Sequence, residues 1–104
     1  MLININYDLL VDSHEKYNHR DLTYNLIGKT VEQSYPDGLE NPYVRTYGRI
    51  QRKFDQALKE KLDTIELEES EKDFLKEVFN SKSVKFQSQL SKFIILLQDE
   101  INRL

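Results

Sequence analysis

The hydrophobic and polar positions of residues 42–62 follow the period of an α-helix. Apolar side chains recur there at spacings of four, three, four and three residues, which places them on one helical face: Tyr43, Tyr47, Ile50, Phe54 and Ala57. Basic side chains form a row on the opposite face, made of Arg45, Arg49, Arg52 and Lys59, with Lys53 beside it. The pattern predicts one long, two-faced helix whose basic row lies in water.

The last segment, Ser88–Leu104, repeats the same spacing. Its apolar positions are Leu90, Ile94, Leu97, Ile101 and Leu104, and Phe93, Ile95 and Leu96 widen the stripe. A stripe of this width exceeds what one antiparallel neighbour covers. We therefore expect its flank to be covered either by N-terminal elements or by a second copy of the chain, so a homodimer is one of two explanations.

A shorter helix is predicted over Glu68–Phe79, after a boundary at residues 63–67. Its first turn is acidic, which suits the positive end of the helix dipole. Its inner face is formed by Phe74, Leu75, Val78 and Phe79, and a turn follows at residues 80–85. This short helix joins the two longer ones.

The first third of the chain has a less regular pattern. Leu2–Tyr7 alternates between apolar and polar side chains, as a short strand does. Asp8–Tyr17 fits a first helix, and Asn18 resembles the N-cap of a second helix over Leu22–Gln33. Residues 22–33 also alternate like a strand and contain Gly28, but a helix is the favoured interpretation.

A loop is predicted at residues 34–42. Pro36-Asp37-Gly38 has turn chemistry, because proline fixes φ and glycine accepts positive φ. Asn41 is then predicted to cap the long helix, with Pro42 at its first position, where no backbone donor is lost.

These elements predict a mainly α-helical fold, a small antiparallel helical bundle with a short N-terminal β-strand. We expect a single helical domain over residues 1–104, with a strand and helices in 1–33, a loop in 34–42 and the helical core in 43–104. A length of 104 residues is enough for one hydrophobic core without cross-links.

Charge is distributed unevenly along the chain, although its net value is only −3. Residues 43–62 hold six basic and two acidic side chains, whereas residues 63–79 hold two basic and seven acidic ones. The chain has no cysteine, which excludes disulfides and fits a reducing cytosol. The start lacks a basic secretory region, and the longest apolar run, Phe93–Leu97, is too short to span a bilayer. We expect a cytoplasmic protein with no membrane association.

Candidate catalytic and metal-binding chemistry is sparse. His14 and His19 are five residues apart, whereas the two-histidine zinc motif needs a spacing of four so that both face the metal. Asp8, Asp12 and Glu15 fall on one helical face, and their carboxylate oxygens are the type of ligand that magnesium prefers. Such acidic rows on helices are usually solvated. The three glycines stand ten residues apart and form no phosphate-binding loop. We expect no enzymatic activity, no cofactor and no bound metal.

The charged faces supply the candidate partner-binding residues, which are Arg45, Arg49, Arg52, Lys53, Lys59, Glu66, Glu69, Asp73 and Glu77. Charge complementarity would accelerate encounter and select the partner, while aromatic side chains would supply most of the binding energy. A protein partner is the favoured interpretation. Nucleic acid is the alternative, because guanidinium groups in a row suit phosphate contacts. A third interpretation is structural, with the charged blocks neutralising each other within the fold.

The segment IELEESEKDFLKEVF (Ile65–Phe79) follows a charged amphipathic helix in an alanine-poor chain of 104 residues. In this respect the chain resembles small accessory proteins of phages and prophages of Gram-positive bacteria. The resemblance covers that segment directly and the rest of the chain by general character. It implies a non-enzymatic regulatory or inhibitory protein of the host cytoplasm that binds a host or phage protein, or an assembly factor of a virion. It assigns no functional residues.

Overall fold

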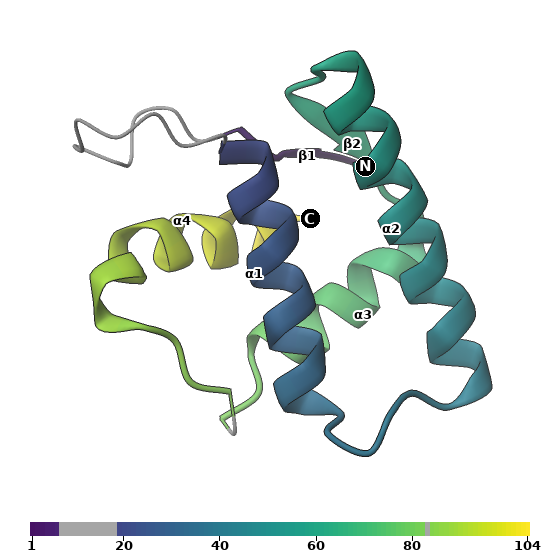
Figure 1. Cartoon of the computed structure of the whole chain (residues 1–104), viewed down its shortest axis with the longest axis vertical. Coiled ribbons are helices and arrows are strands. Elements are labelled where there is room, and N and C mark those ends of the chain that lie inside the picture. The colour runs from purple at the N-terminus through teal and green to yellow at the C-terminus, as the bar shows by residue number, and fades with distance from the viewer. Residues whose placement is uncertain (7–18, 83) are drawn as a thin grey trace.

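The computed structural model describes residues 1–6, 19–82 and 84–104, and within these ranges the chain forms four α-helices and a small sheet (Figure 1). The elements in chain order are β1 (Leu2–Asn4), α1 (His19–Ser34), α2 (Asn41–Glu60), β2 (Thr64–Glu66), α3 (Glu69–Phe79), a 3-10 turn η1 (Ser88–Leu90) and α4 (Ser91–Asn102). The mainly helical class and the N-terminal strand are therefore confirmed. The predictions for residues 8–17, and for Asn18 as a cap, lie outside the described residues.

Helix α1 settles the choice between helix and strand for residues 22–33. Its buried side chains follow helical spacing: Thr23, Leu26, Ile27, Thr30 and Val31. Gly28 lies within the helix where α2 comes close, since a Cβ built on it would be 3.4 Å from the Tyr47 hydroxyl. Packing against α2 thus decides the conformation that local sequence left open.

Helix α2 has the length and the apolar face expected from its sequence, with Ile50, Phe54 and Ala57 buried. The predicted cap was wrong by one residue: Glu40 is the N-cap, and Asn41 is already helical. The Glu40 side chain makes no capping hydrogen bond. Pro42 lacks a backbone N–H, which leaves one fewer donor to satisfy in the first turn.

The boundary predicted at residues 63–67 is a strand that the sequence analysis missed. β2 pairs antiparallel with β1, with Ile3 opposite Ile65. The pairing buries both of these side chains, together with Ile5 and Leu67. A strand of three residues is too short to show a convincing alternation, and it forms here because β1 supplies the partner.

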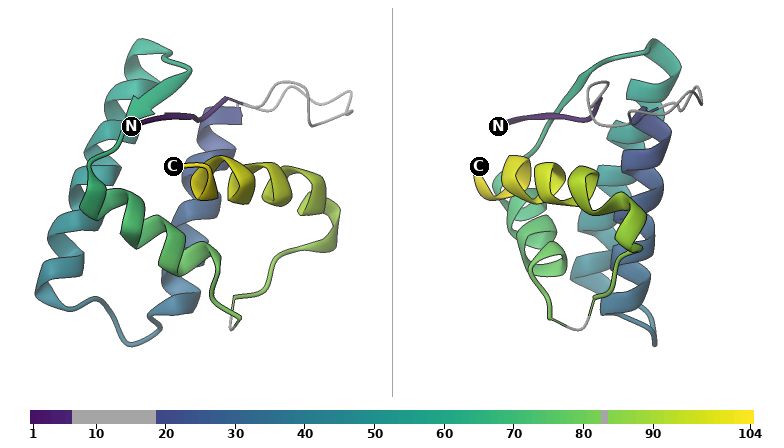
Figure 2. Two further views of the ribbon diagram at one scale, coloured as in Figure 1. Left: turned by 180° about the vertical axis from the view of Figure 1, so that it is seen from behind. Right: turned by 90° about the vertical axis from the view of Figure 1, so that its left-hand side faces the viewer.

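Helix α3 packs against both α2 and α4, as the two views of Figure 2 show. Its first turn contains a capping box between Glu68 and Glu71, a reciprocal pair of hydrogen bonds that satisfies the first amides. Helix α4 is shorter than the predicted Ser88–Leu104, because residues 88–90 form the 3-10 turn instead. Helix α4 packs on α3 and β1. Because α3 also packs on α2, this short helix connects α2 with α4.

The core combines side chains from the helices α1 to α4 and from both strands. Phe54 of α2 and Leu97 of α4 are 1% and 0% exposed. An aromatic cluster closes the end of the molecule near the α1–α2 loop, where Phe74 is surrounded by Tyr35, Tyr43 and Tyr47 at centroid distances of 5.8–6.2 Å. The residues expected at the centre of the two apolar stripes are therefore core residues.

The broad stripe of α4 is covered only in part. Phe93 is buried, but Ile95 and Leu96 are 54% and 40% exposed. The described N-terminal residues thus leave this flank open, and coverage by a second copy stays a prediction. None of the helices in the described part of the chain is long and apolar enough to cross a membrane.

Candidate functional site

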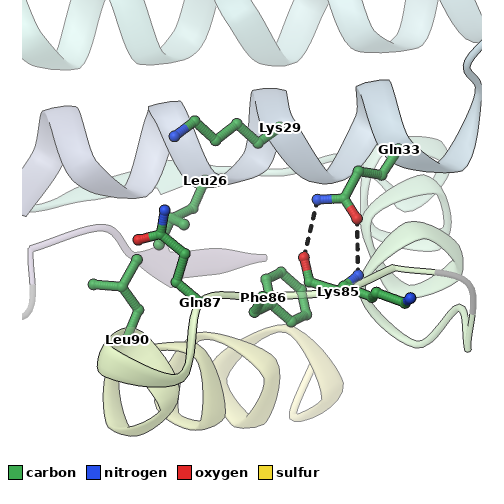
Figure 3. A pocket seen from close by; sticks show the side chains of 7 residues that line it. All are labelled: Leu26, Lys29, Gln33, Lys85, Phe86, Gln87 and Leu90. Carbon is green, nitrogen blue, oxygen red and sulfur yellow. Dashed lines mark hydrogen bonds between the residues drawn. The ribbon is translucent and has the colours of Figure 1, made fainter.

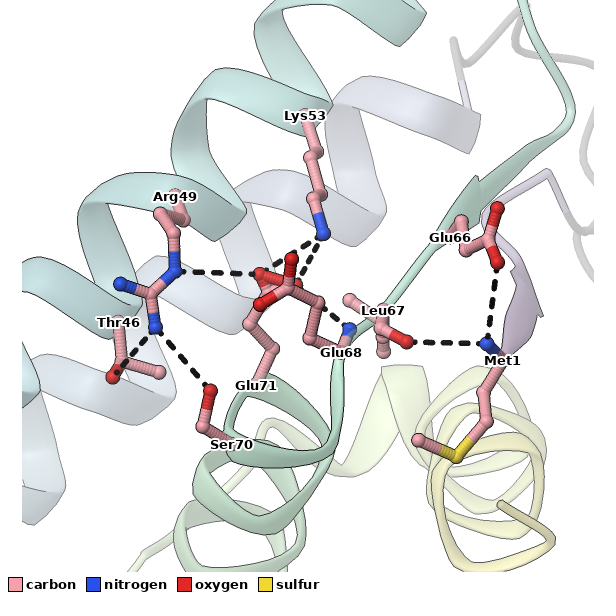
Figure 4. Close-up of polar contacts among 9 residues, drawn as sticks. All are labelled: Met1, Thr46, Arg49, Lys53, Glu66, Leu67, Glu68, Ser70 and Glu71. Carbon is pink, nitrogen blue, oxygen red and sulfur yellow. Dashed lines mark hydrogen bonds and ion pairs between the residues drawn. The ribbon is translucent and has the colours of Figure 1, made fainter.

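The basic row of α2 divides into two groups in the structure. Arg45, Arg52 and Lys59 are exposed and form no ion pair with any described residue. Arg49 and Lys53 instead turn toward the start of α3, with side chains that are 41% and 30% exposed (Figure 4). Arg49 is thus only partly in water, where the whole row was expected to be exposed, and Lys53, which was placed beside the row, is also partly covered. They sit on the flank of α2 that packs against α3.

The carboxylate of Glu71 is the partner of both residues. Lys53 Nζ contacts both of its oxygens and lies 3.0 Å from Oε2, and Arg49 Nε lies 3.9 Å from the same oxygen. The Glu71 side chain is fully buried, and it also accepts a hydrogen bond of 2.9 Å from the Glu68 backbone amide. Burying a carboxylate is costly unless it is paired and hydrogen-bonded, and this cluster meets both conditions.

Glu71 is a residue that sequence reasoning did not assign to any site. The sequence pattern placed it only in the acidic first turn, which suits the positive end of the helix dipole. The capping-box spacing between Glu68 and Glu71 was a usable signal for its hydrogen bond, but not for its burial. The ion pair with Lys53 joins residues that are 18 positions apart and depends on how α2 and α3 pack.

Arg49 is held in place by further contacts. Its Nη2 lies 3.4 Å from the Thr46 hydroxyl and 3.3 Å from the Ser70 hydroxyl, so the guanidinium bridges α2 and α3 (Figure 4). Its Nε is buried and has no hydrogen-bond partner among the described residues, because the nearest Glu71 oxygen is 3.9 Å away. Contacts of this length are weak singly, but together they fix the guanidinium while leaving part of it accessible.

Three arginines of α2 surround one open hollow, which we call the basic hollow. It has a volume of about 410 Å³ and is lined by Val44, Arg45, Gly48, Arg49 and Arg52. Val44 is 49% exposed, so the lining offers an apolar wall as well as three positive charges. Lys53 and Lys59 are not part of this lining.

Gly48 lines the basic hollow without a side chain. A Cβ built on this glycine would meet no heavy atom within 4 Å. Glycine inside a helix costs about 1 kcal/mol relative to alanine. No packing contact inside the protein therefore requires glycine here.

The candidate acidic residues lie outside the hollow and are all exposed: Glu66, Glu69, Asp73 and Glu77. Several have partners of their own. Lys72 Nζ lies 3.4 Å from Glu69 and 3.7 Å from Asp73, and the Met1 ammonium lies 3.7 Å from Glu66. Burial raises the pKa of the Tyr35 hydroxyl, and the charge of Glu77 together with their hydrogen bond raises it further. These carboxylates are thus partly compensated within the fold.

A second concavity lies between α1 and the segment before α4 (Figure 3). It has a volume of about 130 Å³ and an apolar lining from Leu26, Phe86 and Leu90. Its charged lining residues are Lys29 and Lys85, so it gathers two cationic side chains against the three of the basic hollow. The cavity is therefore a weaker candidate site than the basic hollow.

Within the described ranges, no group of three or more histidine, aspartate or glutamate side chains is placed to hold a metal ion. The histidine and carboxylate candidates at residues 8–15 lie outside those ranges, and so does the side chain of His19. The arrangement on α2 combines positive charge with exposed apolar surface at one place. No family model matches the chain, and neither a curated protein nor a solved structure matches it significantly.

Proposed function

We propose that the protein is a stoichiometric binding protein whose basic hollow accepts an acidic surface of a protein partner. The observation that carries this proposal is the convergence of Arg45, Arg49 and Arg52 on one hollow. Two of these guanidinium groups lack an ion-pair partner in the described structure, and the third is fixed by α3. Fixing a side chain before binding lowers the entropy lost on association.

The surroundings of the hollow favour protein over nucleic acid. Val44 provides exposed apolar surface, which a protein partner can bury. The three arginines themselves favour phosphate, so nucleic-acid binding is the second candidate function.

In the cell, this binding would regulate or inhibit the partner in the manner of a small phage-type accessory protein. The support for that role is the resemblance of the Ile65–Phe79 segment and the general character of the chain. The partner would then be a cytoplasmic host or phage protein. A role as a virion assembly factor would use the same surface for a structural contact.

The test is affinity capture from a lysate of the producing cells, followed by mass spectrometry. A variant with Arg45→Glu and Arg52→Glu should fold normally, because both side chains are exposed, yet should lose the partner. Arg49 is left unchanged because its removal would also disturb Glu71. Lys59→Glu is the matched control, since it makes the same type of charge change on α2 outside the hollow.

Capture should survive nuclease treatment and the Lys59→Glu change. Capture that depends on nucleic acid would favour the second candidate function. Equal capture by the double variant and the wild-type protein would contradict the proposal, because the hollow would then contribute nothing.

A further inference from the structure

The three glycines of the chain lie in different surroundings. Gly38 has a φ of 101°, which side-chain-bearing residues rarely adopt, and Gly28 lies where the Tyr47 hydroxyl approaches. Gly48 has neither reason: it is helical, and the space where its Cβ would lie is empty. The empty space opens outward, into the basic hollow.

We infer that Gly48 is the crossing point of an acidic helix belonging to the partner, with Arg45, Arg49 and Arg52 holding its carboxylates. The inference rests on the proposed function and names the chemistry of the partner at the same site. Where a side chain is missing, the backbones of two helices can come closer than usual. The charges of Arg45 and Arg52, unpaired within the described ranges, with the partly exposed guanidinium of Arg49 between them, favour an acidic crossing helix.

The spacing of the arginines fits a helical partner. Arg45 and Arg49 are four residues apart along α2, and Arg49 and Arg52 are three apart, which corresponds to rises of about 6 Å and 4.5 Å. Carboxylates three or four residues apart on one face of a second helix repeat over the same distances. Arg49 is anchored by Ser70 and Glu71, so it provides a fixed point in the middle of the row.

Val44 supplies the complementary apolar contact. It lies one helical turn before Gly48 and is about half exposed. A helix crossing at Gly48 would cover it with the small or apolar side chains between its carboxylates. Polar rim contacts around a small apolar centre are typical of protein interfaces.

The probe for the test is a capped, labelled peptide of Glu-Ala-Ala-Ala repeats, with a Gln-Ala-Ala-Ala peptide as the neutral control. Binding to the whole protein is followed by nuclear magnetic resonance at low and moderate salt. The acidic peptide should shift the Gly48 amide and the side-chain signals of the three arginines. The neutral peptide should not.

Gly48→Ala separates this inference from a structural role. Alanine is a better helix former and has room here, so the thermal midpoint should rise by a few degrees. The same change should lower the affinity for the acidic peptide by roughly tenfold, equivalent to about 1.4 kcal/mol, because the two helix backbones can no longer approach each other closely. Gly48→Gln should weaken it more, whereas Lys59→Glu should leave the affinity nearly unchanged.

Unchanged peptide affinity in Gly48→Ala would overturn the inference, and so would a wild-type protein that does not bind the acidic peptide. The proposed function would survive both results if capture still depended on Arg45 and Arg52. The inference would be overturned in favour of nucleic acid if single-stranded DNA bound more tightly than the acidic peptide, with a steep salt dependence, and shifted the same nuclear magnetic resonance signals.

Discussion

A single carboxylate, that of Glu71, joins three parts of the chain. It pairs with Lys53 across the α2–α3 contact, lies near Arg49, and accepts the backbone amide of Glu68. The carboxylate is fully buried, whereas the side chains of Lys53 and Arg49 are partly exposed. The residue therefore links the stability of the fold to the position of an arginine in the candidate site.

Replacing Glu71 with glutamine should destabilise the protein by about 2–3 kcal/mol, because Lys53 loses its anion and the buried site loses its charge complement. Glu69→Gln, in the same turn but with a side chain that is 79% exposed, should have little effect. Urea unfolding of both variants measures the difference. Equal stabilities would mean that the buried ion pair contributes nothing net.

Asp63 makes stability depend on pH. Hydrogen bonds from the side chains of Asn6 and Arg20 lower its pKa below the ordinary value of 3.8. Because the folded pKa is the lower one, the contribution of Asp63 is complete above the unfolded value and is lost as the pH falls through the folded pKa.

Asp63→Asn should therefore remove part of the acid dependence of the unfolding free energy, with little change in its slope near neutral pH. Chemical unfolding of both proteins across the acidic range measures this slope. An unchanged acid slope would show that the contacts of Asp63 do not favour its ionised form.

At the scale of elements, the long periodic segments were the predictable part. Twenty residues of α2 repeat the helical period many times, so its face could be read directly. β2 has three residues, and its conformation is fixed by pairing with β1, which lies over sixty positions away. The basic row was predictable as a row, but the inward turn of Arg49 and Lys53 depends on a packing angle that no local pattern contains.

Two neighbouring leucines of α4 test the core assignment. Leu97 is fully buried and Leu96 is 40% exposed. Leu97→Ala should cost roughly 2–5 kcal/mol through lost burial and a residual cavity, while Leu96→Ala should cost much less. Thermal or urea unfolding measures both. A similar loss of unfolding free energy in the two variants would mean that α4 is rotated about its axis relative to the observed orientation.

At the scale of the whole molecule, two surfaces stand out on different elements. The basic hollow lies on α2, and the exposed pair Ile95 and Leu96 lies on α4. Charge therefore distinguishes the first surface and apolar area the second.

Self-association is predicted to use the α4 surface. Ile95→Glu should reduce the native mass from that of a dimer to that of a monomer, because it places a charge where a second copy would bury an isoleucine. Light scattering at high micromolar concentration measures the mass, with Lys92→Glu as a charge control on the same helix. A monomeric wild-type protein would contradict the prediction.

The side chain of Gln33 reaches from α1 to the segment between α3 and α4 (Figure 3). Its amide donates to the Lys85 carbonyl at 2.9 Å and accepts from the Lys85 amide at 2.8 Å, as a neighbouring strand would. The Lys85 amide proton should consequently exchange with heavy water slowly, although it belongs to no helix or strand. Gln33→Ala should make that exchange fast and release the segment from α1. The side chain of Gln33 alone would then account for the attachment of this segment to α1.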